Sequence, residues 1–232
     1  MTSFRILTAT FVTAALVGSV EAQAPIQLKQ ADRIVFLGDS ITAAGVLPNG
    51  YINVIRKSLD DKAPELKIEC FGAGIPGNKV SGLQGRVDHV LSSKKPSIVV
   101  IFIGINDVWF GQSDSLIKGT SPELFESGLK DVIGKCENAG ARVLLCTPTV
   151  IGELPEAGNK LDPQLDAYAD ISRRVANEMK LTLCDLRKGF VDHLAKNNDT
   201  KATRGILTID HVHLNPTGNR LVAEMMLKSL GQ

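Results

Sequence analysis

The sequence predicts an α/β fold in which helices cover both faces of a doubly wound parallel sheet. Apolar runs of strand length recur at even spacing, and segments with helical periodicity lie between them. This alternation is typical of βαβ units. The predicted strands are Arg33–Leu37, Leu66–Phe71, Ser97–Ile103, Arg142–Cys146 and Leu181–Leu186. The third and fourth runs are apolar at nearly every position, which indicates strands covered on both faces.

The segments between these runs are predicted to be helices. Tyr51–Leu59 places Ile52, Ile55 and Leu59 on one face. The other predicted helices are Leu83–Leu91, Pro122–Cys136, Pro163–Met179 and Pro216–Leu230. The last three begin with a proline that follows Ser121, Asp162 or Asn215, and proline is favoured at the first helical position. No repeat, low-complexity tract or linker interrupts the pattern. One three-layer α/β/α domain is therefore predicted over residues 25–232.

The first residues are predicted to be a signal peptide, residues 1–22. Arg5 supplies a positive charge, residues 6–20 form an apolar run, and small residues follow. Cleavage after Ala22 is preferred over cleavage after Ala24, because the second site would leave Pro25 next to the scissile bond. A spanning helix needs about 20 apolar residues. We therefore expect export to the periplasm or the medium without stable membrane insertion after cleavage, with an uncleaved tether as the alternative.

Composition excludes several functions. The chain carries 26 basic and 25 acidic residues and a net charge of +1, so it lacks the basic excess of a nucleic-acid binder. Aromatic residues make up only 5% of the chain, too few to favour a platform on which sugars or the bases of single-stranded nucleic acid stack. The cysteines form no Cys-x-x-Cys pair, so a zinc ribbon or a redox motif is unsupported. Three pairings are open to Cys70, Cys136, Cys146 and Cys184, and buried free thiols are at least as consistent with their apolar surroundings.

Polar segments follow the predicted strands, at the edge of a parallel sheet where sites form. The Gly38–Thr42 and Asp210–Leu214 segments bring a serine, a histidine and an acid to this edge. A serine hydroxyl needs a base to accept its proton, and the base needs an acid to fix its tautomer. Ser40, His213 and Asp210 are therefore candidate catalytic residues. A metal site at Asp210, His211 and His213 lacks a further firm ligand, so no metal is expected.

Gly72-x-Gly74-x-x-Gly77 formally matches the dinucleotide-binding fingerprint, but it follows the second predicted strand and lacks the acidic residue expected about 20 positions later. No cofactor is therefore expected. A better use of Gly77 is a backbone N–H aimed at a developing oxyanion. The side-chain amide of Asn106 and the N–H of Ser40 would add two further donors.

Together these residues resemble a known family. Gly38-Asp39-Ser40-Ile41, Gly77, Gly104-x-Asn106-Asp107 and Asp210-x-x-His213 are similar, in order, to the four blocks of the SGNH or GDSL hydrolases. The resemblance extends from about residue 33 to the end of the chain. It implies a flavodoxin-like five-stranded sheet and cofactor-free ester hydrolysis. It also implies that Ser40 is the nucleophile, His213 the base and Asp210 the orienting acid, with Ser40, Gly77 and Asn106 forming the oxyanion hole.

We therefore expect an exported serine esterase that forms an acyl-enzyme on Ser40. A small, export-directed member without a long lid resembles carbohydrate O-acetyl esterases or broad short-chain esterases, so small-molecule or glycan esters are the expected substrates. Asp39 and Trp109 are candidate substrate contacts. Three alternatives stay open: a lysophospholipase or thioesterase, an acyltransferase that uses the same acyl-enzyme, and a binding module that has lost turnover.

Overall fold

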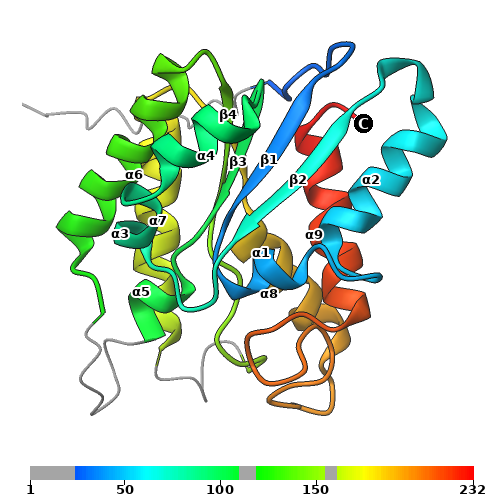
Figure 1. Cartoon of the computed structure of the whole chain (residues 1–232). Helices are drawn as coiled ribbons and strands as arrows, with labels where there is room; N and C mark the ends of the chain where they lie inside the picture. Colours follow the sequence, from blue (N-terminus) through cyan, green and yellow to red (C-terminus); the bar gives the residue numbers. More distant parts are fainter. Residues whose placement is uncertain (1–23, 110–118, 155–160) are drawn as a thin grey trace, which may run out of the picture.

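A five-stranded parallel sheet forms the centre of the molecule, as predicted. The computed structural model describes residues 24–109, 119–154 and 161–232 (Figure 1); the predicted signal peptide lies outside these residues. The strands lie in the order β2-β1-β3-β4-β5, and all neighbours are parallel. Their bounds are β1 Arg33–Gly38, β2 Glu69–Gly74, β3 Ile98–Phe102, β4 Arg142–Cys146 and β5 Thr182–Cys184. This order is that of flavodoxin-like sheets, which confirms the predicted fold class.

Helices cover both faces of the sheet. In Figure 1, α3, α4, α6 and α7 lie on one side, and α2 and α9 lie on the other. The helices are α1 Ser40–Ala44, α2 Tyr51–Lys62, α3 Val80–Gln84, α4 Val87–Lys94, α5 Ile105–Trp109, α6 Pro122–Asn138, α7 Asp162–Glu178, α8 Leu186–Asn197 and α9 Pro216–Ser229. Because both faces are covered, β3 is buried at every position and β1 at all positions but the first. None of the helices in the described part of the chain is long and apolar enough to cross a membrane.

The second strand begins three residues later than predicted. Pro64–Leu66 forms a 3₁₀ helix, and Lys67 follows in the left-handed conformation with φ 49°. This bend ends the preceding segment and starts β2 at Glu69. Gly72 and Gly74 therefore lie within β2 and not, as predicted, after the strand.

Several helix predictions need correction. The predicted helix Leu83–Leu91 is divided between α3 and α4, because the chain leaves the helical conformation at Arg86, where φ is −133°. Helix α8 was not predicted, and Leu186, assigned to the last strand, is its first residue. Ser121 and Asn215 cap α6 and α9 by accepting backbone N–H groups. Asp162 is the first residue of α7 and does not precede the helix.

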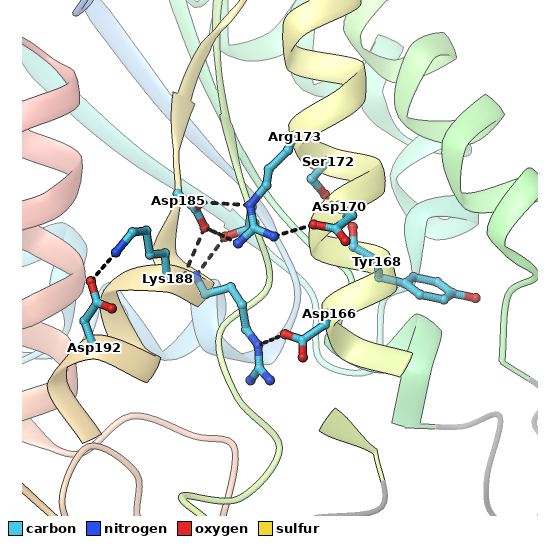
Figure 2. Close-up of polar contacts among 10 residues, drawn as sticks. Asp166, Tyr168, Asp170, Ser172, Arg173, Asp185, Lys188 and Asp192 are labelled. Carbon is cyan, nitrogen blue, oxygen red and sulfur yellow. Dashed lines mark hydrogen bonds and ion pairs between the residues drawn. The ribbon is translucent and has the colours of Figure 1, made fainter. Parts of the chain in front are cut away.

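An ion-pair network joins β5 to the helices beside it. Figure 2 shows Arg173 of α7 reaching Asp185, which directly follows β5. The Arg173 Nε lies 2.8 Å from Asp185 Oδ2, and its Nη1 lies 2.6 Å from Asp170. Asp185 also accepts the N–H of Lys188 and so caps α8. One carboxylate thus fixes the last strand, α7 and the start of α8 relative to one another.

The four cysteines are free thiols in this structure. Cys136, Cys146 and Cys184 are buried and Cys70 is partly buried. Cys146 and Cys184 are register partners on neighbouring strands. Burial raises the pKa of Cys70 and of Cys136 to about 12. These thiols therefore behave as small apolar side chains of the core.

A buried carboxylate holds the amino ends of the strands together. Asp32, directly before β1, accepts hydrogen bonds from Ser97 Oγ at 2.6 Å and from Lys29 N at 2.7 Å. The guanidinium of Arg142, at the start of β4, donates to both of its oxygens. Burial raises the pKa of Asp32, but the hydrogen bonds from Ser97 and Arg142 outweigh burial, and the pKa is lowered overall.

We predict that Asp32→Asn lowers the free energy of unfolding by about 1–3 kcal/mol at pH 7. Because the pKa of Asp32 is lower in the folded protein than its ordinary value of 3.8, the stabilisation is present above pH 3.8 and is lost as pH falls through the folded pKa. Urea unfolding of both proteins across this range measures it. A difference in stability that does not shrink in acid would contradict this account.

Candidate active site

Three predicted residues meet at the carboxyl end of β1. Ser40 is the first residue of α1, directly after the strand, and His213 and Asp210 lie in the loop before α9. His213 Nε2 lies 2.9 Å from Ser40 Oγ, and His213 Nδ1 lies 2.7 Å from Asp210 Oδ2. Asp210 Oδ1 also accepts the N–H of His213 at 2.8 Å and that of Val212 at 3.2 Å. The serine, the imidazole and the carboxylate therefore form one continuous line of hydrogen bonds.

This line can activate a hydroxyl group. With the imidazole proton on Nδ1, His213 donates to Asp210, and its Nε2 can accept the Ser40 proton. Burial raises the pKa of Asp210, but hydrogen bonds from the His213 side chain and backbone and from Val212 outweigh burial. The pKa is therefore lowered overall, and the carboxyl stays ionised. The His213 side chain is 37% exposed. A reactant can therefore approach from solvent.

Two of the predicted oxyanion donors come from the loop after β2 and from α5. Gly77 lies after β2 with φ at +76°, a conformation that side chains disfavour. A Cβ at Gly77 would meet no protein atom within 4 Å, so backbone conformation alone selects glycine here. Asn106, in α5, is 8% exposed and its Nδ2 donates to the carbonyl of Asn78 at 3.0 Å. This bond uses one amide hydrogen and leaves the second for another acceptor.

The other glycines of the formal nucleotide fingerprint have a structural use. A Cβ on Gly74 would lie 2.1 Å from the backbone nitrogen of Ala43, and one on Gly72 would lie 2.4 Å from a methyl group of Val46. The absence of side chains lets α1 approach β2 closely. Gly74 therefore helps to place the helix that begins with Ser40, and Gly72 leaves room for Val46, just after that helix.

Two acids near the site are buried, and one of them, Asp39, directly precedes Ser40. Asp39 is 2% exposed and accepts the N–H of Ile41 at 2.9 Å, so it caps α1. This burial argues against the predicted contact between Asp39 and substrate. Burial, with a smaller contribution from the nearby Asp107 carboxylate, raises the pKa of Asp39 to about 7, although the Ile41 N–H and His213 oppose the rise. Burial also raises the pKa of Asp107, whose oxygens accept the N–H of Val80.

The loop that contains Asp210 and His213 is held by Glu153, which is not among the predicted site residues. Glu153 is fully buried in the loop after β4. Its carboxylate accepts the N–H groups of Ile206, Leu207 and Thr208 and the hydroxyl of Thr208 at 2.6–2.8 Å. The neighbouring Gly152 N–H donates to the His211 carbonyl at 2.7 Å. The loop after β4 thus supports the segment that leads into Asp210.

The two histidines of the alternative metal site, His211 and His213, are engaged by other groups. His211 Nδ1 lies 3.0 Å from the carbonyl of Thr203. Both ring nitrogens of His213 are engaged by Asp210 and Ser40. Within the ranges that the structure describes, no group of three His, Cys, Asp or Glu side chains is arranged to hold a metal ion.

Two hollows adjoin the site, and Asp210 lines both. One, of about 370 Å³, is lined by Trp109, Ile151, Leu161 and His211 among others. The second, of about 720 Å³, opens on Ser40 and His213 and has apolar walls that include Leu47 and Ile209. Trp109, a predicted substrate contact, therefore lies in the hollow beside Asp210, away from the one that contains Ser40.

The chain belongs to the GDSL-like lipase/acylhydrolase family, whose model matches residues 36–221, and this membership and its relatives make it an ester-hydrolysing enzyme. An acetylxylan esterase of Geobacillus stearothermophilus is 28% identical over 223 residues, which cover 88% of this chain and 96% of the relative. The crystal structure of the acetyl xylan esterase AlAXEase is 42% identical with a TM-score of 0.81, over 85% of this chain and 99% of that one. The esterase TesA of Pseudomonas aeruginosa is 30% identical over 121 residues, 51% of this chain and 55% of that protein.

We predict that Asp39→Asn makes the free energy of unfolding less dependent on pH. The pKa of Asp39 is about 7 in the folded protein against 3.8 ordinarily, so the wild type gains stability through this group as pH falls from about 8 towards 4. Asparagine can keep the cap on Ile41 and has no buried charge. The stability of the variant relative to wild type should therefore be greatest above pH 7 and decline in acid. Urea titrations at several pH values measure this difference, and a constant difference would contradict the assignment.

Proposed function

We propose that the protein is a serine esterase that removes O-acetyl or other short acyl groups from carbohydrates through an acyl-enzyme on Ser40. The observation that carries the proposal is the line of hydrogen bonds from Ser40 Oγ through His213 to Asp210. The similarity to acetylxylan esterases, which extends over most of the chain, supports an acetylated glycan as substrate.

In the first half of the proposed reaction, Ser40 Oγ attacks the ester carbonyl carbon while His213 Nε2 takes the hydroxyl proton. Asp210 stabilises the imidazolium. The carbonyl oxygen becomes an oxyanion that accepts hydrogen bonds from the N–H groups of Ser40 and Gly77 and from the Asn106 amide. As the carbon–oxygen bond breaks, His213 gives the proton to the departing sugar oxygen, which leaves as a hydroxyl group. The acyl group remains on Ser40.

In the second half, water replaces the alcohol. His213 removes a proton from water, the resulting hydroxide attacks the acyl carbon, and the same donors hold the second oxyanion. Ser40 leaves with the proton from His213, and the carboxylic acid is released. Every proton is carried by a side chain of the protein, so this scheme uses no cofactor. An acceptor hydroxyl in place of water would give acyl transfer by the same steps.

The apolar hollow beside Ser40 favours a second candidate, hydrolysis of longer acyl chains. Its walls include Ala43, Ala44, Leu47, Pro48 and Ile209. Leu47 is 59% exposed and Ile209 is 63% exposed, so both offer apolar surface to a ligand. A panel of p-nitrophenyl esters of increasing chain length separates this candidate from a deacetylase. Highest kcat/KM with the acetyl ester supports the deacetylase.

We also propose that residues 1–22 direct export of the protein. The support is the order of a basic residue, an apolar run and small residues before Pro25. An enzyme that acts on polymeric glycans has to meet them outside the cell. N-terminal sequencing of the protein recovered from the periplasm or the medium tests this proposal.

We predict that Ser40→Ala abolishes acetate release from acetylated xylan and hydrolysis of p-nitrophenyl acetate. Without the nucleophile no acyl-enzyme forms, and kcat should fall by about 10⁴-fold or more. The melting temperature serves as the control for folding. Turnover close to that of the wild type in folded Ser40→Ala would refute the mechanism. If the wild type hydrolyses p-nitrophenyl acetate but releases no acetate from xylan, only the proposed substrate is refuted.

We predict that Asn106→Ala lowers kcat by about 10²–10³-fold and changes KM little. The amide bonds an oxygen that carries full charge only in the transition state, so the loss falls on the chemical step. Steady-state kinetics with p-nitrophenyl acetate measures both constants. A lower melting temperature with unchanged kcat per folded molecule would instead make Asn106 a purely structural residue of its turn.

A further inference from the structure

Arg86 lies at the break between α3 and α4, behind the loops of the site. Its side chain is partly buried. The guanidinium Nε donates to Asn78 Oδ1 at 2.8 Å, and Nη2 donates to the carbonyl of Gly38 at 2.9 Å. Both acceptors are neutral oxygens. One planar group therefore bridges the carboxyl end of β1 and the loop after β2.

These two acceptors are next to proposed oxyanion donors. Gly38 comes two residues before Ser40, and Asn78 directly follows Gly77. Asn78 also accepts the Nδ2 of Asn106 on its carbonyl at 3.0 Å. Arg86 is therefore connected to all three donor segments, to two directly and to the third through Asn78.

The same loop has a second tie to β1. The N–H of Ile75 donates to the Gly38 carbonyl at 3.2 Å, and the N–H of Asn78 donates to the Ile75 carbonyl at 3.1 Å. The Gly38 carbonyl thus receives one bond from the loop backbone and one from Arg86. The backbone bonds set the turn, and the guanidinium holds the turn against the strand.

We propose that Arg86 is a positioning residue that sets the relative placement of the oxyanion donors on Ser40, Gly77 and Asn106. The inference rests on the proposed function, in which these donors stabilise the transition state. A guanidinium presents its N–H groups in a rigid fork and can hold two acceptors at fixed separation, whereas a lysine ammonium acts as a single point charge. Arginine is therefore required for the shape of its guanidinium group.

Donors that must be in place before charge develops affect kcat more than KM. Loss of the Arg86 guanidinium leaves every donor present but lets the loop after β2 move away from the carboxyl end of β1. Small displacements in an active site can cost about 10²-fold in rate. The expected signature of Arg86 variants is a lower kcat with nearly constant KM and an intact Ser40–His213–Asp210 line.

The test compares kcat and KM of the wild type, Arg86→Ala and Arg86→Lys with p-nitrophenyl acetate. We expect kcat to fall by about 10–10²-fold in both variants. Millimolar guanidinium, below denaturing concentration, should restore part of kcat to Arg86→Ala by occupying the vacated position. Asn78→Ala removes only the Nε acceptor and should lower kcat in the same direction. Combining it with Arg86→Ala should add little, because Arg86→Ala already breaks the bond that Asn78→Ala removes.

Arg142→Ala is the matched control. Arg142 also bonds a carbonyl oxygen, that of Gln27, but lies at the opposite end of the sheet beside Asp32. This variant should lower the melting temperature, keep kcat per folded molecule and show no gain with guanidinium.

Three results would overturn the proposal: wild-type kcat in folded Arg86→Ala or Asn78→Ala, wild-type kcat in Arg86→Lys, and a loss that guanidinium leaves unchanged. Ser40→Ala in the same assay separates this outcome from failure of the proposed function. If Ser40→Ala is inactive and Arg86→Ala is fully active, only the role of Arg86 fails. If Ser40→Ala is active, the proposed function itself fails.

Discussion

His213 Nε2 and Ser40 Oγ lie 2.9 Å apart although 173 positions separate the two residues in the sequence. That contact depends on the whole path of the chain between them. Ser40 is fixed because β1 is a buried inner strand and because α1 packs closely on the glycines of β2. His213 is fixed by a loop whose backbone N–H groups donate to Glu153, a residue of the segment after β4. The sheet therefore determines the geometry of the site through loops that emerge from the same edge.

The sequence predicted the central strands well because burial on both faces leaves a continuous apolar run. It also predicted the residues that meet at the site, since serine, histidine and aspartate stand in short segments that follow strands or precede the last helix. It failed where backbone conformation interrupts a pattern. Lys67 is left-handed and delays β2, and the apolar spacing of Leu83–Leu91 continues across the break at Arg86. Helix α8 was missed although Leu186, Phe190 and Leu194 are spaced for one buried face.

The supporting polar residues could not be predicted from the sequence for a different reason. Glu153 and Arg86 bond mainly to backbone atoms or to residues of other loops, so their partners have no signature in side-chain pattern. The one available signal at Glu153 is an acid directly after the apolar run Val150–Ile151 and a glycine. A buried charge costs free energy unless it is hydrogen-bonded, and each of these groups is satisfied by the segment that it holds. These hydrogen bonds fix the loops around the site.

The two ends of the described chain lie side by side, away from Ser40. The N–H of Ile26 donates to the carbonyl of Ser229, and Thr182, at the start of β5, reaches the carbonyl of Ala24. In Figure 1 these ends are at the top, whereas the loops that follow the strands are at the bottom. A solid support attached near Ala24 or Gln232 would meet the molecule at the end of the sheet opposite Ser40. Immobilised in this way, the enzyme would present its open face to an insoluble polymer.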